Sequence, residues 1–93
     1  MREKRVEQKL VNAVREAGGI APKLVSPGFD GMPDRLLLFP GGKTAFVEVK
    51  APGEKPRPLQ VSRHKLLQRL GFRVYVLDDL AQIGVIINEI LSL

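Results

Sequence analysis

Cysteine is absent from this 93-residue sequence, and His64 is its only histidine. The absence of cysteine excludes disulfide bridges, thiolate zinc sites and cysteine nucleophiles, and a single histidine excludes His-rich metal clusters. Any metal site must therefore be built on carboxylates. Carboxylate and carbonyl oxygens suit hard cations such as Mg²⁺ or Mn²⁺.

Long hydrophobic runs are also missing. No segment approaches the roughly 20 apolar residues that a membrane-spanning helix needs, and no signal-type apolar stretch follows the charged N-terminal residues. We therefore expect an intracellular, cytoplasmic protein.

Acidic residues are outnumbered, since 15 Lys and Arg face 10 Asp and Glu, for a net charge of +5. This excess favours a polyanionic partner, nucleic acid before membrane, although simple solubility explains it equally well. The length predicts one domain over residues 1–93. A content of 44% hydrophobic and 27% charged residues is that of an ordinary globular protein.

The hydrophobic pattern and the positions of Gly and Pro predict an α/β fold with the element order αβββαβα. Strands 35–39 and 44–50 flank the tight turn 40–43 and should form an antiparallel hairpin. The other predicted elements are helix 3–17, strand 20–25, helix 59–70, strand 72–77, and a last helix that is capped by Asp78 or Asp79 and runs through Leu91.

The strand 44–50 carries two charged residues, Glu48 and Lys50, among apolar neighbours. Because side chains alternate along a strand, Phe46, Glu48 and Lys50 should share one face, and Ala45, Val47 and Val49 the other. A carboxylate and an ammonium persist in so apolar a strand most readily when they pair with each other or with a metal. Taken alone, Glu-x-Lys is so common that a salt bridge on an edge strand would be the better interpretation.

Asp34 adds a second carboxylate, because it begins the strand that should pair with 44–50. An aspartate beside Pro33 is also ordinary for a turn or a strand start. Two carboxylates with an adjacent lysine, however, are what hydrolysis of a phosphodiester requires, namely ligands for a divalent ion and a cation beside the attacking water.

These residues resemble the two halves of the signature of the PD-(D/E)xK nuclease superfamily, Pro33-Asp34 and Glu48-Val49-Lys50. The sequence is similar in particular to the virus-type replication-repair nuclease (VRR-NUC) group, which adds Gly31-Met32 before Pro33, Gln60 at a helix start and the strand at 71–76. The resemblance implies a restriction-endonuclease-like αβββαβα core with a mixed central sheet between helices. It also implies a metal-dependent DNA endonuclease of a bacterium or phage.

The resemblance assigns roles to individual residues. Asp34, Glu48 and the Val49 carbonyl are expected to hold Mg²⁺ or Mn²⁺, and Lys50 to orient or activate the attacking water. The expected products carry 5′-phosphate and 3′-hydroxyl ends.

Two further residues join this expected site through the resemblance. Glu7, from the first helix, is expected to complete the metal site, with a solvated helix glutamate as the alternative. Gln60 is expected to complete the catalytic set of Asp34, Glu48 and Lys50, with a surface glutamine in a first helical turn as the alternative.

The segment that follows the hairpin is rich in basic residues, as phosphate contacts near a cut site require. For each of them a solvated helix face is the competing interpretation. The expected DNA-binding residues are Lys55, Arg57, Arg63, His64 and Lys65.

The sequence has no spare domain for reading bases, which favours recognition of DNA by shape and backbone. Branched or Holliday-type junctions are the expected substrates, as the resemblance implies. The last helix has more apolar residues than one face of a small domain needs, which predicts a homodimer, unless its own core buries them. A nuclease-like module that binds DNA or a protein without cutting remains the other interpretation.

Overall fold

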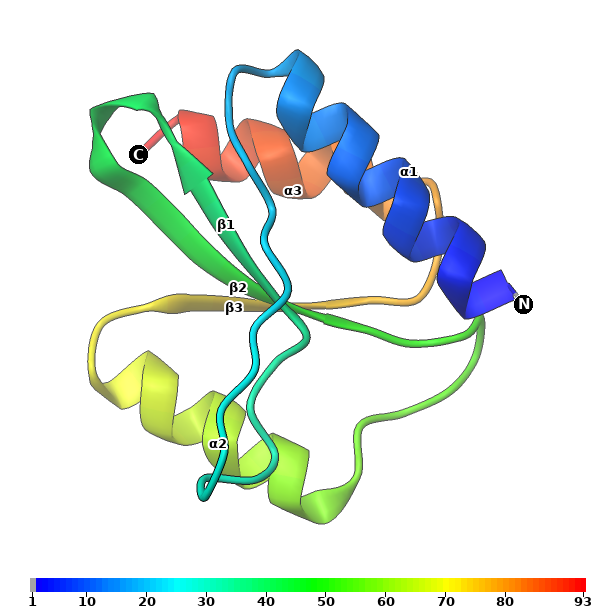
Figure 1. Cartoon of the computed structure of the whole chain (residues 1–93), viewed down its shortest axis with the longest axis vertical. Coiled ribbons are helices and arrows are strands. Elements are labelled where there is room, and N and C mark those ends of the chain that lie inside the picture. Colours follow the sequence, from blue (N-terminus) through cyan, green and yellow to red (C-terminus); the bar gives the residue numbers. More distant parts are fainter. Residues whose placement is uncertain (1) are drawn as a thin grey trace.

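The structure, a computed structural model that describes residues 2–93, places helices on both faces of a small sheet (Figure 1). The sheet order is β1-β2-β3, with β1 antiparallel and β3 parallel to β2. Helices α1 and α3 cover one face, and α2 covers the other (Figure 1). The predicted α/β class with a mixed sheet between helices is confirmed. The elements are α1 (Arg2–Glu16), β1 (Arg35–Phe39), β2 (Lys43–Val49), α2 (Pro58–Arg69), β3 (Arg73–Leu77) and α3 (Gln82–Leu91), with a short 3₁₀ turn at Pro40–Gly42.

The main hydrophobic core lies between the sheet and the α1–α3 layer. In α1, Val6, Leu10 and Val14 recur at every fourth position, so they form one buried stripe. Burial of each such aliphatic side chain contributes roughly 1.5–3 kcal/mol. The sheet supplies Ala45, Val47 and Val49 of β2, and α3 supplies Ile83, Ile86, Ile87 and Ile90.

The opposite face of β2 is directed to α2. Phe46 packs edge-on against Phe72, with ring centroids 5.5 Å apart. Glu48 lies on this same face and is only 1% exposed. The predicted alternation of β2 is therefore confirmed, and it puts a carboxylate into the layer between the sheet and α2.

The predicted strand 20–25 is not a regular strand. Its pairing with the edge of β1 consists of two isolated bridges, Ile20 with Leu38 and Lys23 with Arg35, and does not form a continuous ladder. Pro22 lies between these bridges and has no N–H to donate, although its carbonyl accepts a bond from the Leu36 N–H. The observed order is therefore αββαβα, with the segment 20–24 alongside the sheet in place of a further strand.

The last helix begins at Gln82, and its N-cap is Ala81 in place of the predicted Asp78 or Asp79. Asp79 does act near the helix start, because its carboxylate accepts a 2.9 Å hydrogen bond from the Ala81 N–H. That bond belongs to the turn before the helix, which explains the late start. Across residues 2–93, no helix combines the length and the apolar character required to cross a bilayer.

Candidate active site

The hairpin of β1 and β2 brings Asp34 and Glu48 together at its open end. The last pair of the ladder is Arg35 with Val47, and one step further in the same register sets Asp34 opposite Glu48. Directly opposed residues of an antiparallel pair share a face, with Cβ atoms about 4.5–5.5 Å apart. The two carboxylates thus meet on the face directed to α2, as the sequence predicted.

Asp34 is fixed by its backbone and by its side chain. Its Oδ2 accepts a 2.8 Å hydrogen bond from the Val49 N–H, and its carbonyl accepts one from the Leu24 N–H at 2.8 Å. The preceding Pro33 is fully buried. Together these contacts leave the Asp34 carboxylate little freedom and hold it beside the residue that follows Glu48.

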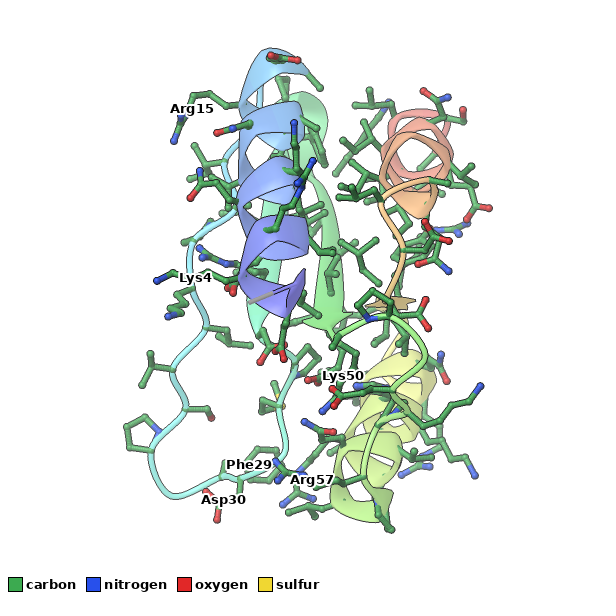
Figure 2. All side chains as sticks on the ribbon, turned by 90° about the vertical axis from the view of Figure 1, so that its right-hand side faces the viewer. Lys4, Arg15, Phe29, Asp30, Lys50 and Arg57 are labelled. Atoms are coloured by element: carbon green, nitrogen blue, oxygen red, sulfur yellow. The ribbon has the colours of Figure 1, made fainter. Side chains whose placement is uncertain are left out.

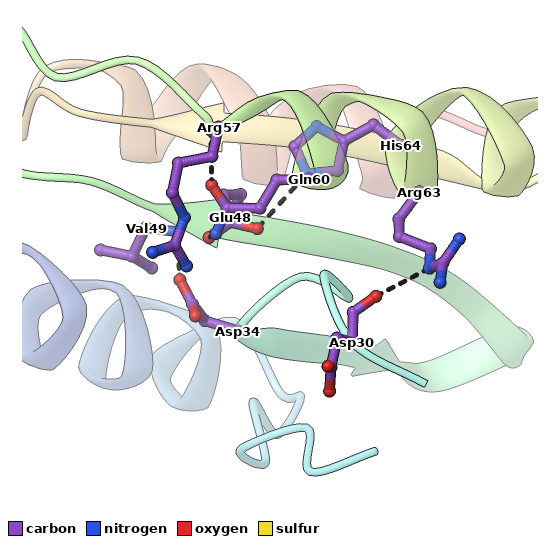
Figure 3. Close-up of polar contacts among 8 residues, drawn as sticks. All are labelled: Asp30, Asp34, Glu48, Val49, Arg57, Gln60, Arg63 and His64. Carbon is purple, nitrogen blue, oxygen red and sulfur yellow. Dashed lines mark hydrogen bonds and ion pairs between the residues drawn. The ribbon is translucent and has the colours of Figure 1, made fainter. Parts of the chain in front are cut away.

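Glu48 is a buried carboxylate with two partners on α2. Its Oε2 accepts a 3.0 Å bond from Gln60 Nε2, and its Oε1 lies 3.3 Å from His64 Nε2 (Figure 3). Burial, and next to it the negative charge of Asp34, raise the pKa of Glu48 from 4.5 to about 8. The carboxyl pair is therefore close enough for mutual repulsion, which a cation between the two groups would relieve.

Gln60 lies at the start of α2, where it has two bonds. Its Oε1 accepts a 2.8 Å hydrogen bond from the Arg57 N–H, which would otherwise lack a partner at the helix N-terminus, while its Nε2 donates to Glu48. The side chain is 7% exposed. This position agrees with a supporting residue and not with a surface glutamine.

His64 follows one helical turn later and is 8% exposed. Burial is the main cause that lowers the pKa of its imidazole below 6.5. The contact between its Nε2 and Glu48 Oε1 holds that carboxyl group in place. This buried position departs from the expectation that His64 contacts DNA.

Positive charges lie next to the carboxyl pair. Lys50 follows the end of β2 on the Glu48 side, and the charges of Lys50 and Arg57 both act to lower the pKa of Glu48. Figure 3 shows the Arg57 side chain extending from the start of α2 towards Asp34. Two carboxylates and two positively charged side chains thus lie at this end of the hairpin. Figure 2 labels Lys50 and Arg57 on this side of the molecule.

Glu7 has a different partner from the one expected. Its Oε2 accepts a 2.8 Å bond from Arg35 Nε, and Arg35 also donates to the Ala21 carbonyl at 2.9 Å. Among residues 2–93, no three His, Asp or Glu side chains are grouped closely enough to hold a metal ion. Glu7 therefore does not join Asp34 and Glu48 here. Strand alternation contained the signal for this, because it directs Arg35, unlike Asp34, to the α1 face.

Replacing Glu7 tests this ion pair. In Glu7→Gln, the mostly buried Arg35 guanidinium loses its ionic partner, so we expect a loss of roughly 1–2 kcal/mol in the free energy of unfolding. Urea unfolding measures this loss, with Glu16→Gln, an exposed residue of the same helix, as the control. We expect less than about a tenfold loss of cleavage, because Glu7 lies outside the contacts that hold Asp34 and Glu48. A loss as large as that of Asp34→Asn would instead return Glu7 to the metal site.

The donor set fits a hard divalent cation. Asp34 and Glu48 supply carboxylate oxygens from paired segments, and Val49, which follows Glu48 and donates its N–H to Asp34, has a backbone carbonyl as a further oxygen. Each carboxylate oxygen has two lone pairs, so the bonds from Gln60 and His64 leave Glu48 able to bind a cation as well. These side chains and the carbonyl are the ones that would hold Mg²⁺ or Mn²⁺.

The predicted DNA-binding residues fall into two groups. Lys55, Arg57 and Lys65 are exposed and available to a ligand. Arg63 is half-buried, and its Nε donates a 2.7 Å bond to the Asp30 carbonyl. No local pattern in the sequence connects the loop around Asp30 with Arg63, since 33 positions separate the two residues.

No model of a known protein family matches the chain. It is 53% identical over 90 residues to "Putative nuclease p44" of Acyrthosiphon pisum secondary endosymbiont phage 1, which covers 95% of this chain and 97% of that protein. A solved structure described as a "VRR_NUC domain" superposes with a TM-score of 0.89 at 32% identity, over 95% of this chain and 96% of the other. With the hairpin geometry of Asp34 and Glu48, these likenesses confirm the resemblance found in the sequence. The chain belongs to the VRR-NUC family of nucleases in the PD-(D/E)xK superfamily.

Proposed function

We propose that this nuclease is a divalent-metal-dependent DNA endonuclease whose catalytic centre is Asp34, Glu48 and Lys50. The observation that carries the proposal is the register of β1 and β2, which sets two carboxylates opposite each other on one face. Burial and then the negative charge of Asp34 raise the pKa of Glu48, as expected where two carboxylates share a site that a cation would neutralise. Phosphodiester hydrolysis is the reaction that such a site serves best.

Asp34, Glu48 and the Val49 carbonyl hold the cation in this proposal. When bound, Mg²⁺ or Mn²⁺ supplies Lewis acidity towards a phosphate oxygen and acidity to a coordinated water. Lys50, on the Glu48 side of the strand, orients the attacking water and stabilises the negative charge that develops on the phosphate. Cleavage then leaves 5′-phosphate and 3′-hydroxyl ends.

Gln60 and His64 act on the reaction through Glu48. Gln60 connects the Arg57 N–H to the Glu48 carboxylate, and His64 contacts the second oxygen of the same group. Two fixed contacts restrict rotation of the carboxylate and so determine where its free lone pairs point. Both residues are therefore positioning residues of the proposed metal site.

The DNA backbone would be bound by the basic residues around the start of α2. Arg57 lies closest to the carboxylates, and Lys55 and Lys65 are exposed on the same segment of the chain. Such contacts bind phosphates without reading bases, which favours recognition of DNA shape. Branched or Holliday-type junctions are accordingly the substrates that we propose.

A homodimer would place two such sites in a fixed relation and allow paired nicks in a junction. Most of the apolar residues of α3 pack into the core of their own chain, which removes much of the surface expected for dimerisation. Val85 of α3 is still 58% exposed, and Val76 of β3 is 36% exposed on a strand that pairs only with β2. We propose this β3–α3 edge as the contact between protomers.

The proposal is tested by incubating the protein with Mg²⁺ or Mn²⁺ and labelled single-stranded, duplex, flap and four-way-junction DNA. We expect cleavage with either metal, none in EDTA, and the fastest cutting on a branched substrate. Sedimentation of the same preparation gives the oligomeric state. Binding of DNA without cleavage of any substrate would contradict the proposal and favour a nuclease-like binding module.

A further inference from the structure

The loop 26–33, which precedes Asp34, is bound to α2 through Arg63. Arg63 Nε donates a 2.7 Å hydrogen bond to the Asp30 carbonyl (Figure 3). The guanidinium carbon of Arg63 also lies 3.9 Å from the centroid of the Phe29 ring, a cation–π geometry. One side chain of α2 thus holds two consecutive residues of the loop.

The loop backbone approaches α2 closely at Gly31. A Cβ at this position would come within 2.8 Å of Leu59 Cγ and 3.1 Å of Arg63 Cγ, and the φ angle of Gly31 is +90°. Only glycine adopts this conformation readily and leaves room for the two side chains. The Arg63 contacts and the Gly31 approach together form one joint between the loop and the helix.

This joint lies immediately before the proposed metal ligand. Gly31 is three residues from Asp34, and the fully buried Pro33 restricts the backbone between them. Asp34 in turn accepts the Val49 N–H, so a shift of the loop that moves Asp34 would weaken that hydrogen bond. The joint therefore bears directly on where the Asp34 carboxylate lies.

We infer that Arg63 is a positioning residue, which holds the loop 26–33 on α2 and thereby keeps Asp34 opposite Glu48. The inference replaces the expectation that Arg63 contacts DNA phosphates, because its Nε and one face of its guanidinium are used within the protein. The expected effect of Arg63 on metal binding rests on the proposed function. The expected effect of Arg63 on the position of Asp34 is independent of that function.

The amide of Val49 offers a readout that needs neither metal nor DNA, because its hydrogen is bonded to the Asp34 carboxylate. In metal-free protein, we expect Arg63→Ala to speed hydrogen exchange at this amide by about tenfold or more. Asp34→Ala removes the acceptor of this hydrogen bond, so it should give the largest increase in the exchange rate of the Val49 amide. Arg69→Ala is the matched control, since it removes the same charge from an exposed position of the same helix.

Measurements of metal affinity and of DNA affinity distinguish a positioning role of Arg63 from a contact of Arg63 with DNA phosphates. We expect Arg63→Ala to weaken Mn²⁺ binding by about 10- to 100-fold, as loss of a residue behind a metal ligand does. DNA affinity in EDTA, measured against salt concentration, should change no more than in Arg69→Ala. Arg63→Lys keeps the charge but not the planar group over Phe29, so it should restore little of the Mn²⁺ affinity.

Unchanged Val49 exchange in Arg63→Ala, with a loss of DNA affinity greater than in Arg69→Ala, would overturn the inference. If Arg63→Ala does not fold, Phe29→Leu provides the test, because it removes the ring and leaves the Arg63 bond to Asp30. We then expect faster Val49 exchange, and an unchanged rate would overturn the inference. A wild-type protein that binds no Mn²⁺ would contradict the proposed function, while the Val49 exchange would still decide the role of Arg63.

Discussion

Asp34→Asn and Lys50→Met are each expected to reduce DNA cleavage by about 10²- to 10³-fold or more, while DNA binding is retained. Asparagine keeps an oxygen that can accept the Val49 N–H, so the strand ends stay paired and only the charge for the cation is lost. Methionine keeps most of the apolar length of Lys50 but removes the ammonium that we propose to stabilise the developing charge. Single-turnover cleavage of a preferred substrate measures both losses.

The two variants should differ in metal affinity. Asp34→Asn removes a proposed ligand, so Mn²⁺ binding should weaken strongly, whereas Lys50→Met removes a nearby positive charge and should not weaken it. Lys55→Met is the control for loss of a basic residue away from the carboxylates, and we expect it to affect mainly DNA affinity and its salt dependence. Full activity in either Asp34→Asn or Lys50→Met would refute the proposed catalytic centre.

The second large effect concerns the stability of the metal-free protein as a function of pH. Burial, followed by the charge of Asp34, raises the pKa of Glu48 from 4.5 to about 8, so the folded state binds this proton more tightly than the unfolded state. The stability gained from this proton is present below pH 4.5 and is lost as the pH rises to about 8. At about 1.4 kcal/mol per pKa unit, the loss amounts to a few kcal/mol.

Glu48→Gln should abolish this loss, because the amide has no charge to bury. His64 contributes with the opposite sign, since its pKa is lowered below 6.5 and its stability contribution is lost as the pH falls. Glu48→Gln should therefore retain only a small gain of stability with rising pH. Urea unfolding in EDTA from pH 5 to 9 measures both curves, and parallel curves would contradict the assignment to Glu48.

The part of the site that follows from local chemistry could be predicted from the sequence. Alternation along β2 placed Glu48 and Lys50 on one face, and the glycine-rich turn at 40–42 indicated the hairpin that brings Asp34 opposite Glu48. The helical spacing of Val6, Leu10 and Val14 identified α1 and its buried side. Each of these features depends on neighbours within one element or one turn.

The other contacts of the site join residues that are far apart in the sequence, and local patterns do not show which of them pair. Glu7 pairs with Arg35, and Arg63 with the Asp30 carbonyl, across 28 and 33 positions of the chain. No periodicity in the sequence records which of several arginines each group meets. His64 was assigned to a basic surface for the same reason, since its burial depends on how α2 rotates towards β2.

The hairpin also has a meaning for the order in which the site assembles. Asp34 and Val49 are 15 positions apart, so bringing the two carboxylates together closes a short loop at a small cost in chain entropy. Gln60 and His64 lie 12 and 16 positions from Glu48, and they contact it only when α2 packs on the sheet. The two like charges are therefore brought together within one hairpin, and the residues that shield Glu48 from water come from the next element, α2.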